Sequence, residues 1–249
     1  PLNKDRRLLT YGLSTTADVK AANIEYFDNH TSFDVVVSNK ILSSAETWKK
    51  ITLPMLGKHN VLNCLASICI AIEMGISENS IRNTLNNFKG IKRRFESKGV
   101  TNNGIKIIDD YGHHPVEITY ALSSGRILAS KNKLIAIFQP HRYSRLKDLF
   151  DEFCQCFNNA DYVFIADVYA AGESEIENFN KETLAAGISD FGHNNVSIIN
   201  NENEICDKIH SVAKPNDVVI FLGAGSITKW SETIVHQLNN SGLKNEKIF

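Results

Sequence analysis

The segment KGIKRRFE, residues 89–96, places Lys92, Arg93 and Arg94 side by side at the end of a predicted helix. Arginine carries a planar fork of N–H donors that matches phosphate oxygens in two bonds, and it stays charged at physiological pH. The cluster is therefore a candidate clamp for an anion. A solvated cluster of surface charge is the alternative, and the segment alone does not decide between them.

Two asparagines near the start of a predicted helix form a second candidate. Asn60 and Asn63, in GKHNVLNCLA, lie about one helical turn apart and so share a face. An asparagine amide offers both a donor and an acceptor, which suits the edge of an adenine base. Capping of the helix start by Asn60 explains that residue equally well.

The segment DDYGHHP, residues 109–115, carries two acids, an aromatic and two histidines directly after a predicted strand. One of its carboxylates could bond ribose hydroxyls, and its tyrosine could pack on a base. Adjacent histidines in a loop point in different directions and lack the spacing of a familiar zinc site, so metal binding here is not favoured. A structural strand-to-helix turn, with Pro115 in the first helical positions, is the alternative.

Two further turns follow predicted strands. HRYSR places Arg142 and Arg145 three residues apart at the opening of a predicted helix, where free N–H groups and the helix dipole favour an anion such as a small carboxylate. A position as solvated charges on the protein surface explains these arginines equally well. LGAGSI has the strand-turn-helix context of a phosphate loop but lacks the full glycine pattern, and close packing of helix on sheet explains it as well.

The elements that must position these side chains change in character along the chain. Up to about residue 56 we expect short strands, including RLLTYG and FDVVVS. Apolar residues then recur at helical spacing from His59 to Met74, with Gly75 as a stop, and Ser77 can cap a second helix that runs to about Phe88.

After Phe95 the chain alternates between short apolar runs and helix-length amphipathic segments. The predicted strands are IKIIDD, KLIAIF, YVFIAD, VSII and DVVIFLG. The predicted helices are VEITYALSSGRILA, LKDLFDEFCQCF, KETLAAGI, EICDKIHSVA and ITKWSETIVHQL. Such alternation predicts an α/β domain with a parallel sheet covered on both faces, whose ligands bind at the carboxyl ends of the strands.

Composition excludes some classes of protein. The 249 residues are 43% hydrophobic and carry a formal charge of -1, so no global charge attracts nucleic acid or an anionic membrane. Five cysteines without a CxxC pair favour a reduced, cytoplasmic setting over a disulfide framework.

The longest apolar stretch, VLNCLASICIAIEMG, is too short and too interrupted to span a bilayer. The opening PLNKDRRLLTYG has neither an initiator methionine nor a signal peptide, so we expect the chain to begin within a longer protein.

Taken in order, GKHNVLN, GIKRRFE, IDDYGHHP, QPHRYSR, DVYAAGE and GAGSI resemble the Mur ligases. The series spans about residues 57–227, and the flanking RLLTYG and ADVKAANI are similar to this family too. The family plan implies that residues 1–91 are the C-terminal portion of a central ATP-binding domain of P-loop type. Residues 92–249 are then the Rossmann-like C-terminal domain that brings in the amino acid.

The resemblance also implies roles for individual residues. Arg94 would reach the ATP phosphates and, with Asp110, belong to the catalytic machinery. Asp110 would bond the ribose, and Arg142 and Arg145 would bind the carboxylate of L-alanine. Asn60 and Asn63 would bind the nucleotide on its adenine side. Tyr111 and His113 would line the nucleotide.

The activity implied is ATP-dependent amide formation in peptidoglycan precursor synthesis. The carboxylate of UDP-N-acetylmuramate takes the γ-phosphoryl group to become an acyl phosphate, and the amine of L-alanine attacks it. Mg²⁺ and cationic side chains would offset the charge on the phosphoryl oxygens. No GxxxxGK[ST] occurs in the chain, and the metal ligands are expected upstream of it. The chain alone is therefore not expected to ligate, and the N-terminal half of the ligase is its implied partner.

Three alternatives stay open at this point. The murein peptide ligases of the same family reuse a tripeptide, although HRYSR and DDYGHHP are more similar to the alanine-adding members. A module that binds nucleotide or amino acid without chemistry is consistent with the missing P-loop. A dehydrogenase that uses LGAGS is disfavoured, because the dinucleotide fingerprint is incomplete. Neither nucleic acid nor membrane insertion is expected in any of these cases.

Overall fold

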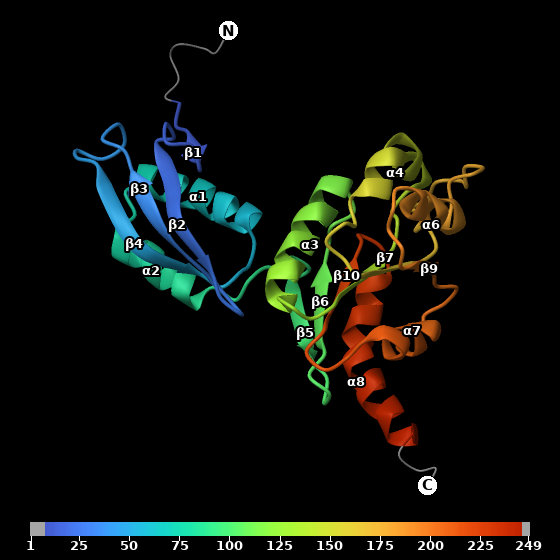
Figure 1. The fold of residues 1–249 in the computed structure, drawn as a ribbon. Helices are drawn as coiled ribbons and strands as arrows, with labels where there is room; N and C mark the ends of the chain where they lie inside the picture. The colour runs from blue at the N-terminus through green and yellow to red at the C-terminus, as the bar shows by residue number, and fades with distance from the viewer. Residues whose placement is uncertain (1–7, 246–249) are drawn as a thin grey trace. The chain divides into compact units, whose positions relative to one another are not determined.

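The computed structural model describes residues 8–245 of the chain, which divides into two compact units, residues 1–90 and 91–249 (Figure 1). Each unit has its own buried apolar core. Within the described residues, no helix is long and apolar enough to cross a membrane.

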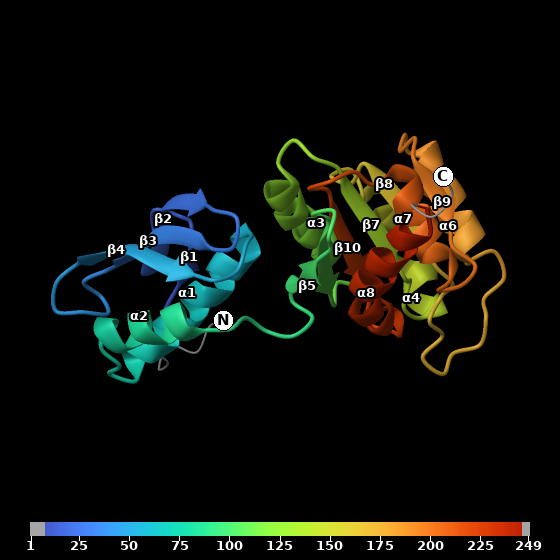
Figure 2. The same cartoon turned by 90° about the horizontal axis from the view of Figure 1, so that it is seen from below.

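The first unit is a four-stranded sheet with two helices on one face (Figure 2). Its strands, in spatial order, are β1 (Tyr11–Gly12), β2 (Val19–Tyr26), β3 (Thr31–Val37) and β4 (Glu46–Leu53). β1 runs parallel to β2, and the other pairs are antiparallel. FDVVVS is a strand as predicted, whereas RLLTYG is wrong as a full strand because only its last two residues pair; its Arg7 lies outside the described residues.

The two helices of this unit follow the predicted apolar pattern. α1 (Lys58–Glu73) buries Val61, Leu65 and Ile68 against the sheet. Ser77 caps α2 (Glu78–Asn87) as predicted, with its hydroxyl accepting a bond from the Ser80 N–H. The capping of α1 by Asn60 was wrong, because the helix begins after Gly57 and places Asn60 inside its first turn.

The second unit is built on a six-stranded sheet of order β5-β6-β10-β7-β8-β9. The strands are β5 (Glu96–Val100), β6 (Lys106–Asp110), β7 (Leu134–Phe138), β8 (Tyr162–Ile165), β9 (Val196–Ile198) and β10 (Val218–Leu222). All neighbours except β5 and β6 pair in parallel, which confirms the predicted α/β class. β5 is an antiparallel edge strand that the sequence does not reveal, because ESKGV is polar and half-exposed.

Helices cover both faces of this sheet. They are α3 (Pro115–Ala129), α4 (Tyr143–Asp148), α5 (Phe150–Gln155), α6 (Lys181–Asp190), α7 (Glu204–Val212) and α8 (Ile227–Asn245). Alternate residues of β10 point to opposite cores: Ile220 packs with α3 to α6, and Phe221 packs with α7 and α8. The helix predicted over LKDLFDEFCQCF is divided at Leu149, whose backbone leaves the helical region.

Candidate functional site

The loops that follow β6, β7, β8 and β10 meet at the carboxyl edge of the second sheet. Gly223 N–H donates to the Asp110 carbonyl at 3.1 Å, which joins the loops after β10 and β6. The Tyr169 N–H donates to the Pro140 carbonyl at 2.8 Å, which joins the loops after β8 and β7. Four of the segments singled out by sequence are thus neighbours at the edge where parallel sheets bind ligands.

Asp110 is held rigidly at the end of β6. Its Oδ2 accepts a bond from the Phe95 N–H and its Oδ1 one from the Gly112 N–H, each at 2.7 Å, and the residue is 5% exposed. Burial raises the pKa of this carboxyl to about 6, although the two N–H groups and the nearby Arg94 act in the opposite direction. At neutral pH Asp110 is therefore a fixed acceptor, suited to donors such as hydroxyls.

The two arginines of KRRFE have different environments. Arg93 donates from Nη2 to the Gly223 carbonyl at 2.7 Å, and its Nε lies 3.9 Å from Oδ2 of the fully buried Asp109. Arg94 is 48% exposed, and its contact with Glu117 is a loose one of 3.9 Å. Arg93 is thus tied to the sheet, whereas Arg94 keeps donors available for a ligand.

Aromatic rings line the site. Tyr111 lies under both guanidinium groups, with its ring centroid 4.6 Å from Cζ of Arg93 and 5.7 Å from Cζ of Arg94. His113 contacts Tyr111 edge-on, and its Nδ1 is 3.0 Å from the Tyr111 carbonyl oxygen. His113 is also 5.8 Å, between ring centroids, from His141 in the next loop.

The second histidine of DDYGHHP has a structural position. His114 is the N-cap of α3: its ring nitrogen accepts from the Val116 N–H, and Glu117 bonds back to the His114 N–H. Pro115 occupies the first turn, as the structural interpretation of this segment expected. The histidine pair therefore divides into His114, which starts the helix, and His113, which faces the other loops.

Asn60 and Asn63 belong to the first unit. The Asn60 amide is buried, 6% exposed, and donates to the Leu56 carbonyl at 2.8 Å. Asn63 is exposed on the same helix. The two therefore differ in what they can offer a ligand, because the nitrogen of Asn60 already has a protein partner.

The opening of α4 differs from the sequence expectation of a free anion site. Glu173, from the loop after β8, accepts from the Ser144 N–H at 3.0 Å and from the Ser144 hydroxyl at 2.7 Å. Its Oε1 lies 3.7 Å from Nη1 of Arg142. Arg145 donates from Nη1 to the His141 carbonyl at 3.2 Å. A carboxylate of the chain itself thus occupies the helix start, so an anion bound there would have the arginine side chains as its available donors.

Close packing explains the glycines of LGAGSI. A Cβ on Gly223 would lie 2.8 Å from the Gln139 carbonyl oxygen, and one on Gly225 would lie 2.6 Å from Cγ of Tyr169. The Gln139 side chain accepts from the Ile227 N–H at 3.1 Å and so bonds the start of α8. Of the two interpretations of this turn, the structure favours packing of helix and loop on the sheet.

The individual contacts of three residues at this edge were not predicted: those of Asp109, Gln139 and Glu173. Asp109 opens DDYGHHP and Gln139 opens QPHRYSR, but nothing in their spacing shows that their side chains bond to α8. Glu173 ends DVYAAGE, and only the left-handed turn at Ala171 and Gly172 directs it back toward α4. Such a turn could have been suspected from the AG pair.

A Rossmann-like sheet whose strand ends carry arginines, a buried acid and aromatic rings is typical of nucleotide- or anion-binding α/β proteins. Residues 93–225 match the model of the Mur ligase glutamate ligase domain, and residues 2–71 match that of the Mur ligase middle domain. The chain belongs to the Mur ligase family, as the resemblance of its motifs indicated.

Relatives of known name within this family are similar to the chain over nearly its whole length. The chain is 48% identical over 238 residues to the UDP-N-acetylmuramate–L-alanine ligase of Rhodospirillum rubrum, covering 96% of this chain and 49% of that protein. It is 41% identical to the Agrobacterium fabrum enzyme of the same name, covering 98% of this chain and 51% of that protein. The chain thus spans about half the length of these relatives.

Solved structures agree with this assignment. The UDP-N-acetylmuramate-alanine ligase MurC of Thermotoga maritima matches with a TM-score of 0.76 and 25% identity, over 94% of this chain and 48% of that one. The MurF ligase of T. maritima in complex with ADP shares the fold, with a TM-score of 0.65 and 17% identity, over 96% of this chain and 49% of that one.

The side chains that the structure describes include no ready-made magnesium site. Within residues 8–245 no group of three or more His, Cys, Asp or Glu residues is arranged to hold a metal ion. The carboxylates at the carboxyl edge are bonded to N–H groups, a hydroxyl or cationic side chains instead.

Proposed function

We propose that the chain is the part of an ATP-dependent ligase that joins L-alanine to the carboxylate of UDP-N-acetylmuramate through an acyl phosphate. The observation that carries the proposal is the identity of 48% to the R. rubrum ligase of that name across 96% of the chain. The ATP dependence is consistent with the ADP bound in a ligase of the same fold. Synthesis of peptidoglycan precursors from these substrates sets the protein in the cytoplasm.

We propose domain limits of 1–91 and 92–249, with nucleotide and amino acid held by the side chains described above. Asp110 would accept from ribose hydroxyls, because its carboxylate is fixed and buried. Arg94 would reach the phosphates, because it is the more exposed arginine of its cluster. Arg142 and Arg145 would bind the carboxylate of L-alanine. The remaining nucleotide contacts are proposed for Tyr111, His113, Asn60 and Asn63.

The reaction needs groups that the proposed residues do not supply. The chain has no GxxxxGK[ST] loop, so a partner segment has to cradle the β- and γ-phosphates and hold Mg²⁺. Since the chain spans about half the length of its relatives, we propose that this partner is the remaining, N-terminal half of the ligase.

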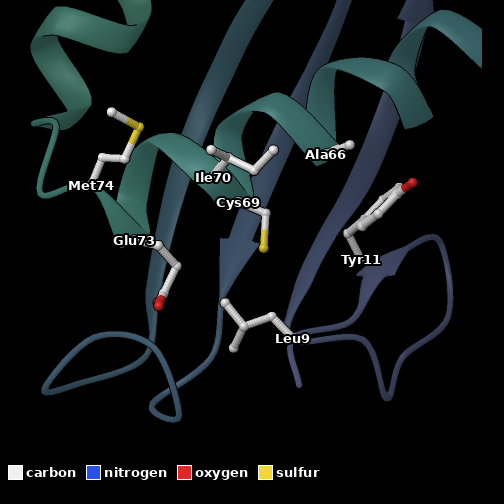
Figure 3. A pocket seen from close by; sticks show the side chains of 7 residues that line it. All are labelled: Leu9, Tyr11, Ala66, Cys69, Ile70, Glu73 and Met74. Carbon is white, nitrogen blue, oxygen red and sulfur yellow. The ribbon is translucent and has the colours of Figure 1, made fainter. Parts of the chain in front are cut away.

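The surface that this half would cover lies on the first unit (Figure 3). Ile70 and Met74, which are 62% and 73% exposed, project from the end of α1 beside a pocket of about 580 Å³, opposite Leu9 and Tyr11. Strand β1 ends the sheet next to it, and on its outer side no strand of the described residues pairs with it. An apolar face beside an open sheet edge fits the continuation of an α/β domain.

The docking proposal is tested by association of separately expressed halves. Met74→Glu together with Ile70→Asp should abolish co-elution of this chain with the N-terminal half of the R. rubrum relative in size-exclusion chromatography. Asn83→Asp, on the exposed side of α2, is the matched control and should leave co-elution unchanged. Equal elution of both variants with the partner would place the contact elsewhere.

The activity is tested with the same N-terminal half joined ahead of residue 1. This chimaeric ligase should release phosphate from ATP only when both UDP-N-acetylmuramate and L-alanine are present, and neither half alone should do so. Arg145→Ala should raise KM for L-alanine, and Asp110→Ala should raise KM for ATP. A preference for the murein tripeptide over L-alanine would favour the murein peptide ligases instead. Release of phosphate that does not depend on the amino acid would contradict the proposal.

A further inference from the structure

The loop that follows β8, here called the β8 loop (residues 166–180), is fastened to the arginine side of the site at two places. The Arg142 N–H donates to the Tyr169 carbonyl at 2.9 Å, and the rings of Tyr169 and His141 stack with centroids 5.4 Å apart. Four residues further on, Glu173 bonds Ser144 through both carboxylate oxygens. The β8 loop therefore controls the surroundings of Arg142 from two sides.

The backbone at both ends of this contact is strained. Arg142 has a φ of 72° with a ψ of 131°, and Ala171 has a φ of 52°; positive φ values of this kind cost a residue with a side chain about 1–3 kcal/mol. Gly172, with a φ of 87°, completes the turn that brings Glu173 back toward α4. Strain of this kind persists only where surrounding contacts fix it, and it clusters at ligand sites.

Glu173 forms an ion pair with Arg142 without a direct hydrogen bond. Its strong bonds go to Ser144, while its distance to Nη1 of Arg142 is 3.7 Å, longer than a hydrogen bond. The Arg142 side chain remains 51% exposed. A guanidinium has five N–H donors, so a contact on one side leaves the others for a second carboxylate.

We infer that Glu173 is a positioning residue for the amino-acid substrate: its carboxylate fills the start of α4 and holds the Arg142 guanidinium toward the site. The substrate carboxylate is then bound by arginine forks alone, in a fixed orientation, and not by the helix N–H groups. This inference deepens the proposed function and depends on it. Fixing the arginine beforehand removes part of the rotamer entropy that binding would otherwise cost.

The direction in which one substitution changes the affinity for L-alanine separates this inference from simple charge repulsion. Glu173→Gln keeps an acceptor for Ser144 and removes the charge. If Glu173 merely repelled or competed with the ligand carboxylate, its neutralisation would tighten binding. If it positions Arg142, the same change should weaken L-alanine binding about tenfold, which corresponds to about 1.4 kcal/mol.

The experiment is an NMR titration of the 249-residue chain with L-alanine. Glu173→Gln should weaken binding, and Ser144→Ala should weaken it less, because the bond from the Ser144 N–H remains. Glu177→Gln, an exposed residue of the same loop with the same charge change, is the control and should bind like the unaltered chain. Unchanged or tighter binding by Glu173→Gln overturns the inference alone. No binding by the unaltered chain overturns the proposed amino-acid site as well, and the inference with it.

A second measurement tests the ion pair between Glu173 and Arg142 in the absence of a ligand. The Ser144 bonds and Arg142 hold the pKa of the Glu173 carboxyl below its usual range. Carbon NMR of the side-chain carboxyl should show this low pKa in the unaltered chain and a higher one in Arg142→Gln. Identical pKa values in the two proteins would show that the charges are not coupled and would overturn the inference.

Discussion

Replacement of Arg93 by alanine should destabilise the second unit, whereas replacement of Arg94 should not. The Arg93 side chain donates to the Gly223 carbonyl at 2.7 Å and stacks over Tyr111. A hydrogen bond to a charged group contributes about 1.5–3 kcal/mol and a cation–π contact about 0.5–1 kcal/mol. Its removal also leaves Asp109 buried with one fewer cation nearby. We expect a loss of about 2–4 kcal/mol in the free energy of unfolding.

The chain provides its own reporters for this measurement. Trp230 lies in α8 of the second unit and Trp48 in β4 of the first, so Trp48→Phe leaves a single tryptophan, which reports on the second unit when excited at its own absorption edge. In urea, with an m-value of about 2 kcal/mol/M, Arg93→Ala should lower the unfolding midpoint by about 1–2 M. Arg94→Ala, at a half-exposed position, should change the free energy of unfolding by less than about 0.5 kcal/mol.

Two results would refute this reasoning. Equal midpoints for Arg93→Ala and the parent would show that the contacts with Gly223 and Tyr111 contribute nothing. An equal loss for Arg94→Ala would show that the two arginines are not distinguished by their environments. Asp109→Asn in the Arg93→Ala background should restore part of the stability, because it removes the buried charge that was left without its partner.

Three further outcomes are expected. Because the pKa of Asp110 is about 6 in the folded chain against an ordinary 3.8, the folded state holds this proton more tightly. Its contribution to stability should therefore fall by about 3 kcal/mol between about pH 4 and 6 and stay constant above; Asp110→Asn should lack this fall in urea unfolding series. Gly225→Ala, whose new Cβ would lie 2.6 Å from Cγ of Tyr169, should lose about 1–3 kcal/mol in thermal unfolding. Asn60→Ala should lose about 1–2 kcal/mol of first-unit stability, read from Trp48 fluorescence, and Asn63→Ala almost none.

Most of the second unit was predictable from the sequence because its pattern of short strands and amphipathic helices is strong. The five parallel strands are short, three to five residues, each with Ile or Val residues at its centre or ends, and β7 and β10 are buried along their whole length. Such strands need crossover helices, so alternation along the chain determines the class of fold. Strand β5 was missed because an edge strand with one exposed face carries no such pattern.

The first unit was harder to predict. RLLTYG is apolar enough for a strand, yet it forms only two paired residues at the edge of the sheet, where β2 is its single neighbour within residues 8–245. Pairing of this kind depends on what lies beside the strand in space. Local sequence does not contain that information.

The candidate site was predictable as a set of loops but not as a set of contacts. The strand-end rule brings together the turns after β6, β7, β8 and β10, whatever their side chains. The occupation of the α4 start by Glu173 depends on a turn with two left-handed residues, Ala171 and Gly172, which follow Arg145 by 26 and 27 positions along the chain. Long-range bonds of this kind do not follow from residue types. The roles assigned to individual site residues stay predictions.

The bonds between KRRFE and the loop after β6 have a mechanical consequence. The Phe95 N–H is bonded to Asp110, and the Tyr111 N–H donates to the Arg93 carbonyl at 2.7 Å. The segment from Arg93 onward is therefore fastened to the second sheet by these bonds and belongs to the second unit. A ligand on Asp110 would thus bear directly on the anchor of this segment.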